Sequence, residues 1–368
     1  MTLRPEQRRL ALGLAVAALA LALALWGVPL AEVGAAIGSA RWPGLLAVAA
    51  IFLGQQGLRA LRQKLILDAA AAPLPYREHL SVLCVGFLAI NTLPGRIGEV
   101  VRPLLLLERH GLPMGAGFAL VFVERSVDLF ATLCMIAAAA TLLPPPPGLL
   151  DLAPGSAEAI QTARRVAWLA LPALAIGFAT VLLGGRRLLD RVLPLLDRGP
   201  ARWRSLLLRL TGFAHNFLDG LQGLRRPALL VQVLGLTAFT WVASIWMFPL
   251  AAWSFGFGSL VGYAEGVGLL AVSMLGGVIP GAPGAVGTYE AALRGGLMLY
   301  GISGPQPVPE GASSMDAAAV AFALTLHWWV YLVQASTAIW FLVVDRIDPR
   351  ALVRRAREAL RASALPAP

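Results

Sequence analysis

Polar and charged side chains interrupt two long apolar stretches of this chain at points where helix-breaking residues also occur. The first interruption, at 91–102, reads Asn-Thr-Leu-Pro-Gly-Arg-Ile-Gly-Glu-Val-Val-Arg. The second, at 279–290, reads Ile-Pro-Gly-Ala-Pro-Gly-Ala-Val-Gly-Thr-Tyr-Glu. Both contain Pro-Gly-x-x-Gly with a glutamate just beyond. Broken helices at matching places in the two halves of a membrane protein indicate a binding site.

The first break has the groups that bind an anion. A helix that begins at Gly95 exposes unpaired N–H groups and the positive end of its dipole. Arg96 adds a planar, permanently charged donor suited to phosphate. Arg96, Glu99 and Arg102 share a broad helical face, and Asn91 can satisfy loosened backbone groups. We therefore expect an anionic head group to bind here.

The second break predicts a similar helix start at Gly284. Thr288 is expected to cap a helix whose first turn holds Glu290, and Arg294 stands four residues on, where it can pair with that glutamate. The predicted substrate-binding residues of the two breaks are Asn91, Gly95, Arg96, Glu99, Arg102, Gly284 and Glu290.

Other ionisable residues lie within apolar segments, where charge is costly and usually faces a partner or a water-filled cavity. Glu124 and Asp128 lie one turn apart, with Arg125 beside them. They are either a functional pair or fixed ion pairs with the arginines of the first break. His327 is either a proton carrier or, as we favour, a hydrogen-bonded packing residue. The residues predicted to gate or to form structural ion pairs are Glu124, Arg125, Asp128, Arg294 and His327.

Composition indicates that all this chemistry lies in a membrane. The chain has 368 residues, 58% of them hydrophobic and 14% charged, and its mean hydropathy is +0.73. Soluble domains carry about twice that share of charge. Several nearly uncharged windows are long enough to cross a bilayer. We therefore predict an all-α polytopic membrane protein.

The charge and cysteine content of the chain indicate which kinds of molecule it binds. The net charge of +10 comes almost entirely from arginine, which in a membrane protein indicates cytoplasmic loops and anionic lipid head groups rather than nucleic acid. Cys84 and Cys134 both lie in apolar segments, and no Cys/His zinc spacing occurs. No metal, cofactor or disulfide is expected.

The apolar pattern predicts about six full spans and two broken hairpins. The expected spans are 10–28, 43–62, 114–143, 166–183, 227–251 and 317–344, and the expected hairpins are 79–109 and 263–300. The hairpins are re-entrant or tightly bent full spans. Between spans, 184–226 has an apolar stripe at helical spacing, typical of a helix on the membrane surface or packed on its own protein. That stripe comprises Trp203, Leu206, Leu207, Leu210, Phe213, Phe217 and Leu221.

Basic loops predict the topology. Both termini, 59–79 and 184–226 are expected in the cytoplasm, while the loops at 29–42, 144–163, 252–262 and 301–316 are expected outside. Each half then reads span, span, broken hairpin, span, so the halves form two inverted repeats with a boundary near 144–165. We divide the chain into a membrane part over 1–183, a basic amphipathic segment over 184–226, a membrane part over 227–345 and a basic tail over 346–368.

Three ordered motifs resemble one membrane family. They are Asn91-x-x-Pro94-x-Arg96-x-Gly98-Glu99-x-x-Arg102, Glu124-Arg125-x-x-Asp128 and Pro283-Gly284-x-x-Gly287-x-x-Glu290. This set is similar to the lysylphosphatidylglycerol synthase transmembrane-domain family, also called flippase-like or UPF0104. The resemblance covers nearly the whole chain and implies an integral membrane protein that moves lipids between leaflets. Members often have an arginine in the final span, where this chain offers His327.

The resemblance and the charged breaks together predict a lipid flippase of a bacterial-type inner membrane. Its substrate would be an anionic or modified phospholipid, aminoacyl- or glyco-linked, or a polyprenyl-linked lipid, bound between the two breaks. Aminoacylating members carry a large soluble domain after the membrane part, and only about 24 residues follow the last span here, so that reaction is not expected. The alternatives are a membrane-embedded enzyme that modifies lipid head groups and an accessory subunit of a glycosyltransferase or envelope-assembly complex. A homo-oligomer or an envelope-synthesis partner is compatible with either.

Overall fold

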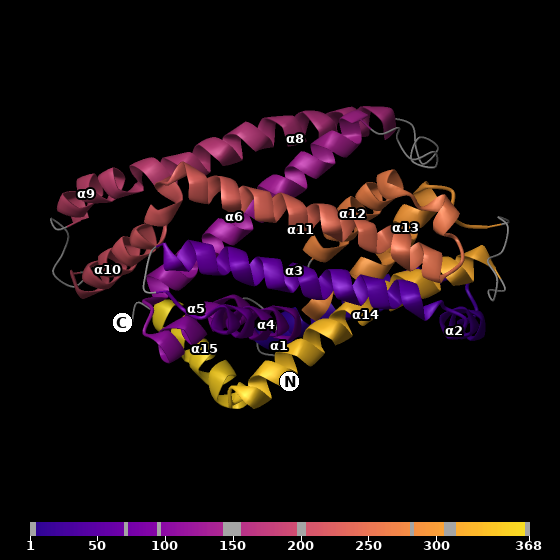
Figure 1. The fold of residues 1–368 in the computed structure, drawn as a ribbon, viewed down its shortest axis with the longest axis horizontal. Helices are drawn as coiled ribbons and strands as arrows, with labels where there is room; N and C mark the ends of the chain where they lie inside the picture. The colour runs from indigo at the N-terminus through magenta and orange to yellow at the C-terminus, as the bar shows by residue number, and fades with distance from the viewer. Residues whose placement is uncertain are drawn as a thin grey trace. The chain divides into compact units, whose positions relative to one another are not determined.

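The structure is a computed structural model that describes residues 5–69, 73–93, 97–142, 156–196, 204–279, 283–304 and 314–364. These residues form helices joined by short turns, with no strand among them (Figure 1). The predicted all-α class is therefore confirmed. The α-helices are α1 (Pro5–Leu25), α2 (Leu30–Gly38), α3 (Trp42–Asp68), α4 (Tyr76–Thr92), α5 (Ile97–His110), α6 (Met114–Leu142), α8 (Ser156–Ala179), α9 (Gly185–Leu196), α10 (Arg204–Gly220), α11 (Pro227–Ser254), α12 (Tyr263–Val278), α13 (Thr288–Leu299), α14 (Met315–Val344) and α15 (Pro349–Ala364).

Within the described ranges, four helical segments are long and apolar enough to cross a membrane. They are Trp42–Asp68, Arg164–Arg191, Pro227–Ser254 and Met315–Val344. A fifth candidate is the pair Ala11–Leu25 and Leu30–Gly38, bent by 78°. These segments match five of the expected spans. The sixth, α6, runs for 29 residues and has Glu124, Arg125 and Asp128 in its first half. The six-span count and the inverted repeats stay predictions.

Two segments that the sequence analysis treated as connections are helices. The predicted external loop at 29–42 contains α2, which starts after Pro29 and buries Val33 and Ala36. Proline just before a helix fixes the backbone angle without losing a needed donor. The basic tail contains α15, whose Leu352 and Ala356 are buried. Helix formation there follows from an apolar stripe within an arginine-rich sequence.

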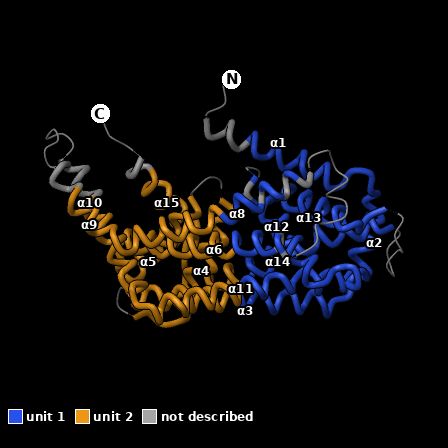
Figure 2. Tube along the Cα trace, turned by 90° about the horizontal axis from the view of Figure 1, so that it is seen from above, with its two compact units in different colours: residues 1–55, 132–168, 241–336 blue, residues 56–131, 169–240, 337–368 orange. Residues whose placement is uncertain are grey.

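The chain divides into two compact units, coloured separately in Figure 2. The first comprises residues 1–55, 132–168 and 241–336, and the second comprises 56–131, 169–240 and 337–368. Each has its own apolar core. Phe257 and Phe322, both fully buried, meet at 5.5 Å between ring centres in the first unit. Leu105 and Leu120 are among the buried residues of the second.

The amphipathic segment that follows α9 packs on its own protein. Phe213 of α10 meets Phe118 of α6 at 5.7 Å between ring centres, and Phe217 meets Phe122 at 5.5 Å. Leu221, at the end of the same stripe, is buried. Of the two interpretations of this stripe, packing against the protein is therefore confirmed for its second half. Trp203 lies outside the described residues.

Both predicted hairpins are present, and glycine allows their helices to approach closely. Helices α4 and α5 pack together, as do α12 and α13. A Cβ at Gly98 would lie 2.4 Å from the Cα of Ile90, and a Cβ at Gly276 would lie 2.6 Å from the carbonyl oxygen of Thr288. Only glycine permits such contact with backbone. Pro94, Gly95 and Arg96 of the first break lie outside the described residues, as does 280–282 of the second.

Candidate functional site at the two broken hairpins

The first hairpin is joined to α6 by a buried ion pair. Arg102 of α5 donates from Nη1 to Glu124 Oε2 at 2.5 Å and from Nη2 to Glu124 Oε1 at 3.1 Å. Nη2 also donates to the side-chain oxygen of Gln63 at 2.5 Å. Arg102 is 2% exposed and Glu124 is 4% exposed. A two-pronged pair between planar groups is the strongest common form of charged hydrogen bond.

Neighbouring residues complete the pocket around the Arg102 guanidinium. The ring of Phe87 lies 5.6 Å from the Arg102 guanidinium and 5.6 Å from that of Arg59. The stem of Arg102 fills the space that a side chain at Gly86 would need, since a Cβ there would lie 2.0 Å from Arg102 Cγ. Arg102 is thus held by a carboxylate, an amide and an aromatic ring. This arrangement favours a bracing role over ligand binding for Arg102.

Asp128 has a partner that the sequence analysis did not identify. Arg62 of α3 donates to the Asp128 carboxylate at 2.7 and 3.2 Å and to the Thr237 hydroxyl at 2.7 Å. Arg62 is thus a partner of Asp128 in addition to the arginines of the first break that were expected to neutralise the acids of α6. Arg62 belongs to the cluster that ends the second expected span, 66 residues away from Asp128.

The remaining predicted residues of the first half are more accessible. Glu99 and Arg125 are exposed, and neither makes an ion pair with a described residue. Asn91 is half-buried at the end of α4. Gly95 and Arg96 lie outside the part of the chain that the structure describes. Glu99 therefore remains open to a ligand, whereas Arg102 does not.

The second hairpin contains a fully buried carboxylate at the start of α13. Glu290 Oε2 accepts the backbone N–H of Gly287 at 2.7 Å, and Glu290 Oε1 lies 2.9 Å from His327 Nδ1 of α14. Gly287, at φ +84°, is the N-cap. The predicted cap, Thr288, is instead the first helical residue and donates to the carbonyl of Ala285 at 3.1 Å. Glycine is used because the cap backbone is left-handed.

His327 is the accessible side of this pair. Its ring stacks on Tyr289 at 4.4 Å between centres, and its side chain is 14% exposed while that of Glu290 is 0% exposed. Gly284, at φ +73°, lies in the turn Pro283–Ala285 just before the cap. His327 is therefore the more exposed member of the pair, and the Glu290 carboxylate lies behind it.

Arg294 does not pair with Glu290. Its Nη1 donates instead to the carbonyl oxygens of Leu23, Ala24 and Trp26, at 3.2, 2.9 and 3.0 Å. Leu23 and Ala24 lie in the last turn of α1 and Trp26 follows its end, where backbone carbonyls lack the usual partner four residues on. A guanidinium satisfies several of them at once and also complements the negative end of the helix dipole. The spacing of Glu290 and Arg294 allows an ion pair on one helix face. Because α1 packs against α13, its carbonyl oxygens bind the arginine instead.

The two hairpins share a pattern that no single motif predicted. In each, the second hairpin helix is joined to the next long helix by one buried pair, Arg102 to Glu124 in one case and Glu290 to His327 in the other. The cation is on the hairpin in the first and the carboxylate is on the hairpin in the second. No group of metal-ligating side chains occurs among the residues that the structure describes.

Comparison with known proteins agrees with the motifs. The chain is similar to the glycosyltransferase AglD of Haloferax volcanii, with 28% identity over 315 residues, covering 79% of this chain and 49% of that protein. The chain thus spans about half the length of this curated relative. No solved structure matches this chain. The model of the lysylphosphatidylglycerol synthase TM region matches residues 10–309, so this chain belongs to that family of integral membrane proteins.

Proposed function

We propose that this protein moves a lipid with an anionic or modified head group between the leaflets of a bacterial-type inner membrane. The substrate class is an aminoacyl- or glyco-linked phospholipid or a polyprenyl-linked lipid. Family membership supports the general role. The observation on which we base the site is the Glu290–His327 pair at the start of α13. Ionisable groups in such surroundings are costly and mark substrate or proton pathways.

The geometry suggests how the pair would act. His327 is the accessible member, and it contacts the incoming head group first. An amine or sugar hydroxyl can then replace His327 as the donor to Glu290, while the imidazole turns toward phosphate. The bond from Gly287 N–H keeps the carboxylate in place during this exchange. The start of α13 would thus lose its link to α14 only when substrate is bound.

The competing role for Glu290 and His327 is a fixed brace between α13 and α14. Transport and stability measured on the same variants separate the two. We expect Glu290→Gln and His327→Gln to slow leaflet exchange of fluorescent phosphatidylglycerol in proteoliposomes by roughly 10-fold or more, the scale of losing one hydrogen bond to a charged group. Exchange is read from dithionite quenching of the outer leaflet.

The chain supplies a matched control for Glu290→Gln. Glu265 has the same position at the start of α12, where its Oε2 accepts the Gly262 N–H at 2.9 Å, but it has no histidine partner. Glu265→Gln should exchange lipid at the wild-type rate. If Glu290→Gln keeps the wild-type exchange rate and only unfolds at a lower temperature, the pair is a brace and the proposed site is wrong.

A second candidate is a role in glycosylation, supported by the name of the relative from Haloferax volcanii. In that case the accessible His327 would contact a glycosyl head group rather than a phospholipid. Purified protein incubated with a polyprenyl phosphate and a nucleotide sugar tests this. A new glycolipid in mass spectrometry would make the protein an enzyme, and unchanged lipid would leave translocation as the better proposal.

A further inference from the structure

The last helix, α15, has one buried and one basic face. Ala351, Leu352 and Ala356 are buried, and the helix packs against α5. Arg355 binds Glu108 of α5 at 2.8 Å and so fixes the rotation of the helix. Three other arginines, Arg350, Arg354 and Arg357, are exposed at helical spacing.

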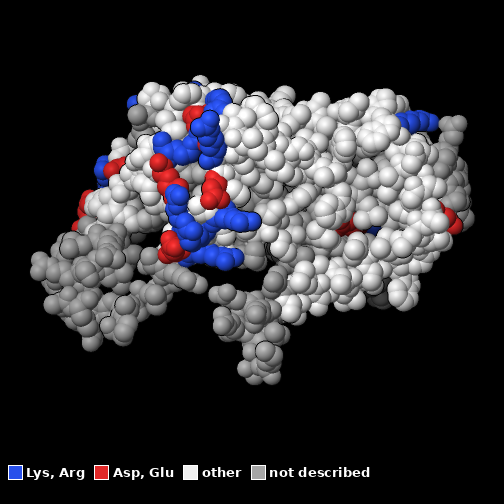
Figure 3. Space-filling view, turned by 90° about the horizontal axis from the view of Figure 1, so that it is seen from below, with Lys and Arg blue, Asp and Glu red and all other residues white. Residues whose placement is uncertain are grey.

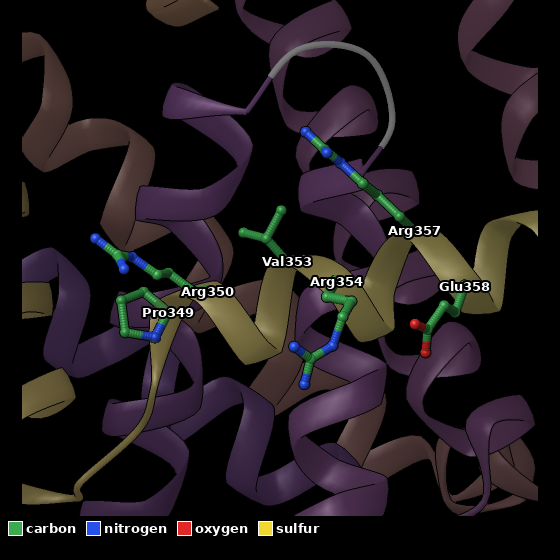
Figure 4. A pocket seen from close by; sticks show the side chains of 6 residues that line it. All are labelled: Pro349, Arg350, Val353, Arg354, Arg357 and Glu358. Atoms are coloured by element: carbon green, nitrogen blue, oxygen red, sulfur yellow. The ribbon is translucent and has the colours of Figure 1, made fainter.

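These three arginines line a shallow groove. The space has a volume of about 570 Å³ and is bounded by Pro349, Arg350, Val353, Arg354, Arg357 and Glu358. Figure 4 shows all six side chains projecting from α15, with Arg357 and Arg354 extending to opposite sides of the ribbon. Among the described residues, the side chains of Arg350, Arg354 and Arg357 make no ion pair. Three guanidinium groups therefore remain available to anions.

The preceding helix fixes the depth of this groove relative to a membrane. Helix α14 meets the length and hydropathy requirements of a span and ends at Val344. Its last turns expose an apolar surface that includes Trp340 and Val343, the latter 70% exposed. Lipid tails are the natural cover for such a surface, and tryptophan favours the boundary with the head groups.

Only residues 345–348 separate α14 from α15. This connection reaches at most roughly 18 Å even when fully extended. Helix α15 must therefore lie within the head-group layer or directly above it. Figure 3 shows acidic and basic side chains gathered in one area of the face that carries α15. Two acids close to α15 in the sequence or by contact are engaged, since Asp345 accepts from Arg77 and Arg109, and Glu108 accepts from Arg355. Glu358 lines the groove itself.

We propose that the Arg350, Arg354 and Arg357 face of α15 is a docking surface for the phosphate groups of anionic phospholipids. Guanidinium is the side-chain group best matched to phosphate because it donates two parallel hydrogen bonds. Three such groups on one helix, held at head-group depth by a neighbouring span, can each bind the phosphate of a separate lipid. This surface shares no residue with the Glu290–His327 pair and requires no transport by it.

Lipid retention tests this proposal on the full chain. The protein is purified with equal amounts of phosphatidylglycerol and phosphatidylcholine of matched acyl chains, and the lipids that stay bound are compared by native mass spectrometry. Wild type should prefer phosphatidylglycerol. Each arginine near an anionic surface is worth roughly fivefold in binding, so replacing all three with glutamine should lower the preference by roughly a hundredfold if their effects add.

Two further variants and a competition with inorganic phosphate serve as controls for the lipid-retention measurement. A variant with Arg164, Arg165 and Arg187 changed to glutamine removes the same charge from exposed positions at the ends of another candidate span and should lower the preference less than the triple α15 variant does. The single change Arg354→Glu, which leaves the Arg355 to Glu108 bond in place, should weaken the preference even if the triple variant fails to fold. Inorganic phosphate in excess should not displace the lipid.

The proposal is overturned if the triple variant, or Arg354→Glu where the triple does not fold, retains phosphatidylglycerol as wild type does. It is also overturned if inorganic phosphate removes the preference, because the groove would then bind a soluble anion. Equal loss in the Arg164, Arg165 and Arg187 variant would contradict it as well, since the effect would belong to net charge rather than to α15.

Discussion

Changing Glu124 to glutamine should destabilise the protein far more than the same change at Glu99. In the folded protein, the Glu124 carboxylate accepts two N–H groups of Arg102, which is 2% exposed. Glutamine offers one acceptor oxygen and turns a donor toward the guanidinium, so a buried charge loses its counterion. Breaking a buried ion pair from one side costs about 3–5 kcal/mol, and the remaining Gln63 bond favours the lower end, about 3 kcal/mol.

Thermal unfolding in detergent, followed by the fluorescence of the 10 tryptophans, measures this effect. At roughly 2 °C per kcal/mol for a chain of this size, Glu124→Gln should lower Tm by about 6 °C. Glu99→Gln should change Tm by less than about 1 °C, because Glu99 is exposed and makes no ion pair with a described residue.

Removing both charges provides the critical comparison. The double variant Arg102→Met with Glu124→Leu leaves no uncompensated charge, and apolar replacement of a buried pair is often neutral. Its Tm should therefore recover most of the loss seen in Glu124→Gln. The assignment of a buried pair would be refuted if the double variant had a lower Tm than Glu124→Gln. It would also be refuted if Glu124→Gln had the same Tm as Glu99→Gln.

Two further predictions concern packing and pH. Gly98→Ala should destabilise the protein by about 1–3 kcal/mol because its Cβ would lie 2.4 Å from Ile90 Cα. Gly54→Ala is the control: a Cβ there meets nothing within 4 Å, so the change should be neutral or stabilise by up to about 1 kcal/mol. Equal Tm shifts of the two variants would contradict the close approach of α4 and α5. Burial alone would raise the pKa of Asp345, but hydrogen bonds from Ser81, Arg109 and Arg77 hold that pKa below its ordinary value. The stability that this gives is present above the ordinary carboxyl pKa of about 4 and is lost as pH falls through the lowered pKa. On acidification, the Tm of wild type should therefore fall more than the Tm of Asp345→Asn. If the two proteins show parallel curves of Tm against pH, Asp345 does not contribute.

The sequence predicted the helices of both hairpins to within a few residues. The expected segment 263–279 is α12 (Tyr263–Val278), and 79–93 is α4 (Tyr76–Thr92). Clustered proline and glycine at the breaks favour a helix end, so these boundaries depend largely on local chemistry. The short α2 was missed because a nine-residue helix between proline and glycine has too little periodic signal.

Partners across the fold were harder to predict than helices. Arg62 and Asp128 are 66 residues apart, and Glu290 and His327 are 37 apart. No periodic pattern links positions on different helices, so the sequence showed which residues are costly to bury but not which pairs they form. Arg294 illustrates the difference. Its spacing from Glu290 is right for an ion pair, but its guanidinium donates to carbonyl oxygens at the end of α1 instead.

The central claim is that this chain carries lipid between leaflets, and leaflet exchange in proteoliposomes tests it most directly. Purified wild-type protein is reconstituted with a trace of fluorescent phosphatidylglycerol, and dithionite is added from outside. Slow or absent quenching of the inner leaflet is the protein-free baseline. The account predicts that wild type exposes the inner-leaflet lipid well above that baseline and that Glu290→Gln returns exposure toward it. Wild-type liposomes that behave like protein-free ones for phosphatidylglycerol and for glycosylated and polyprenyl-linked lipids would contradict the account.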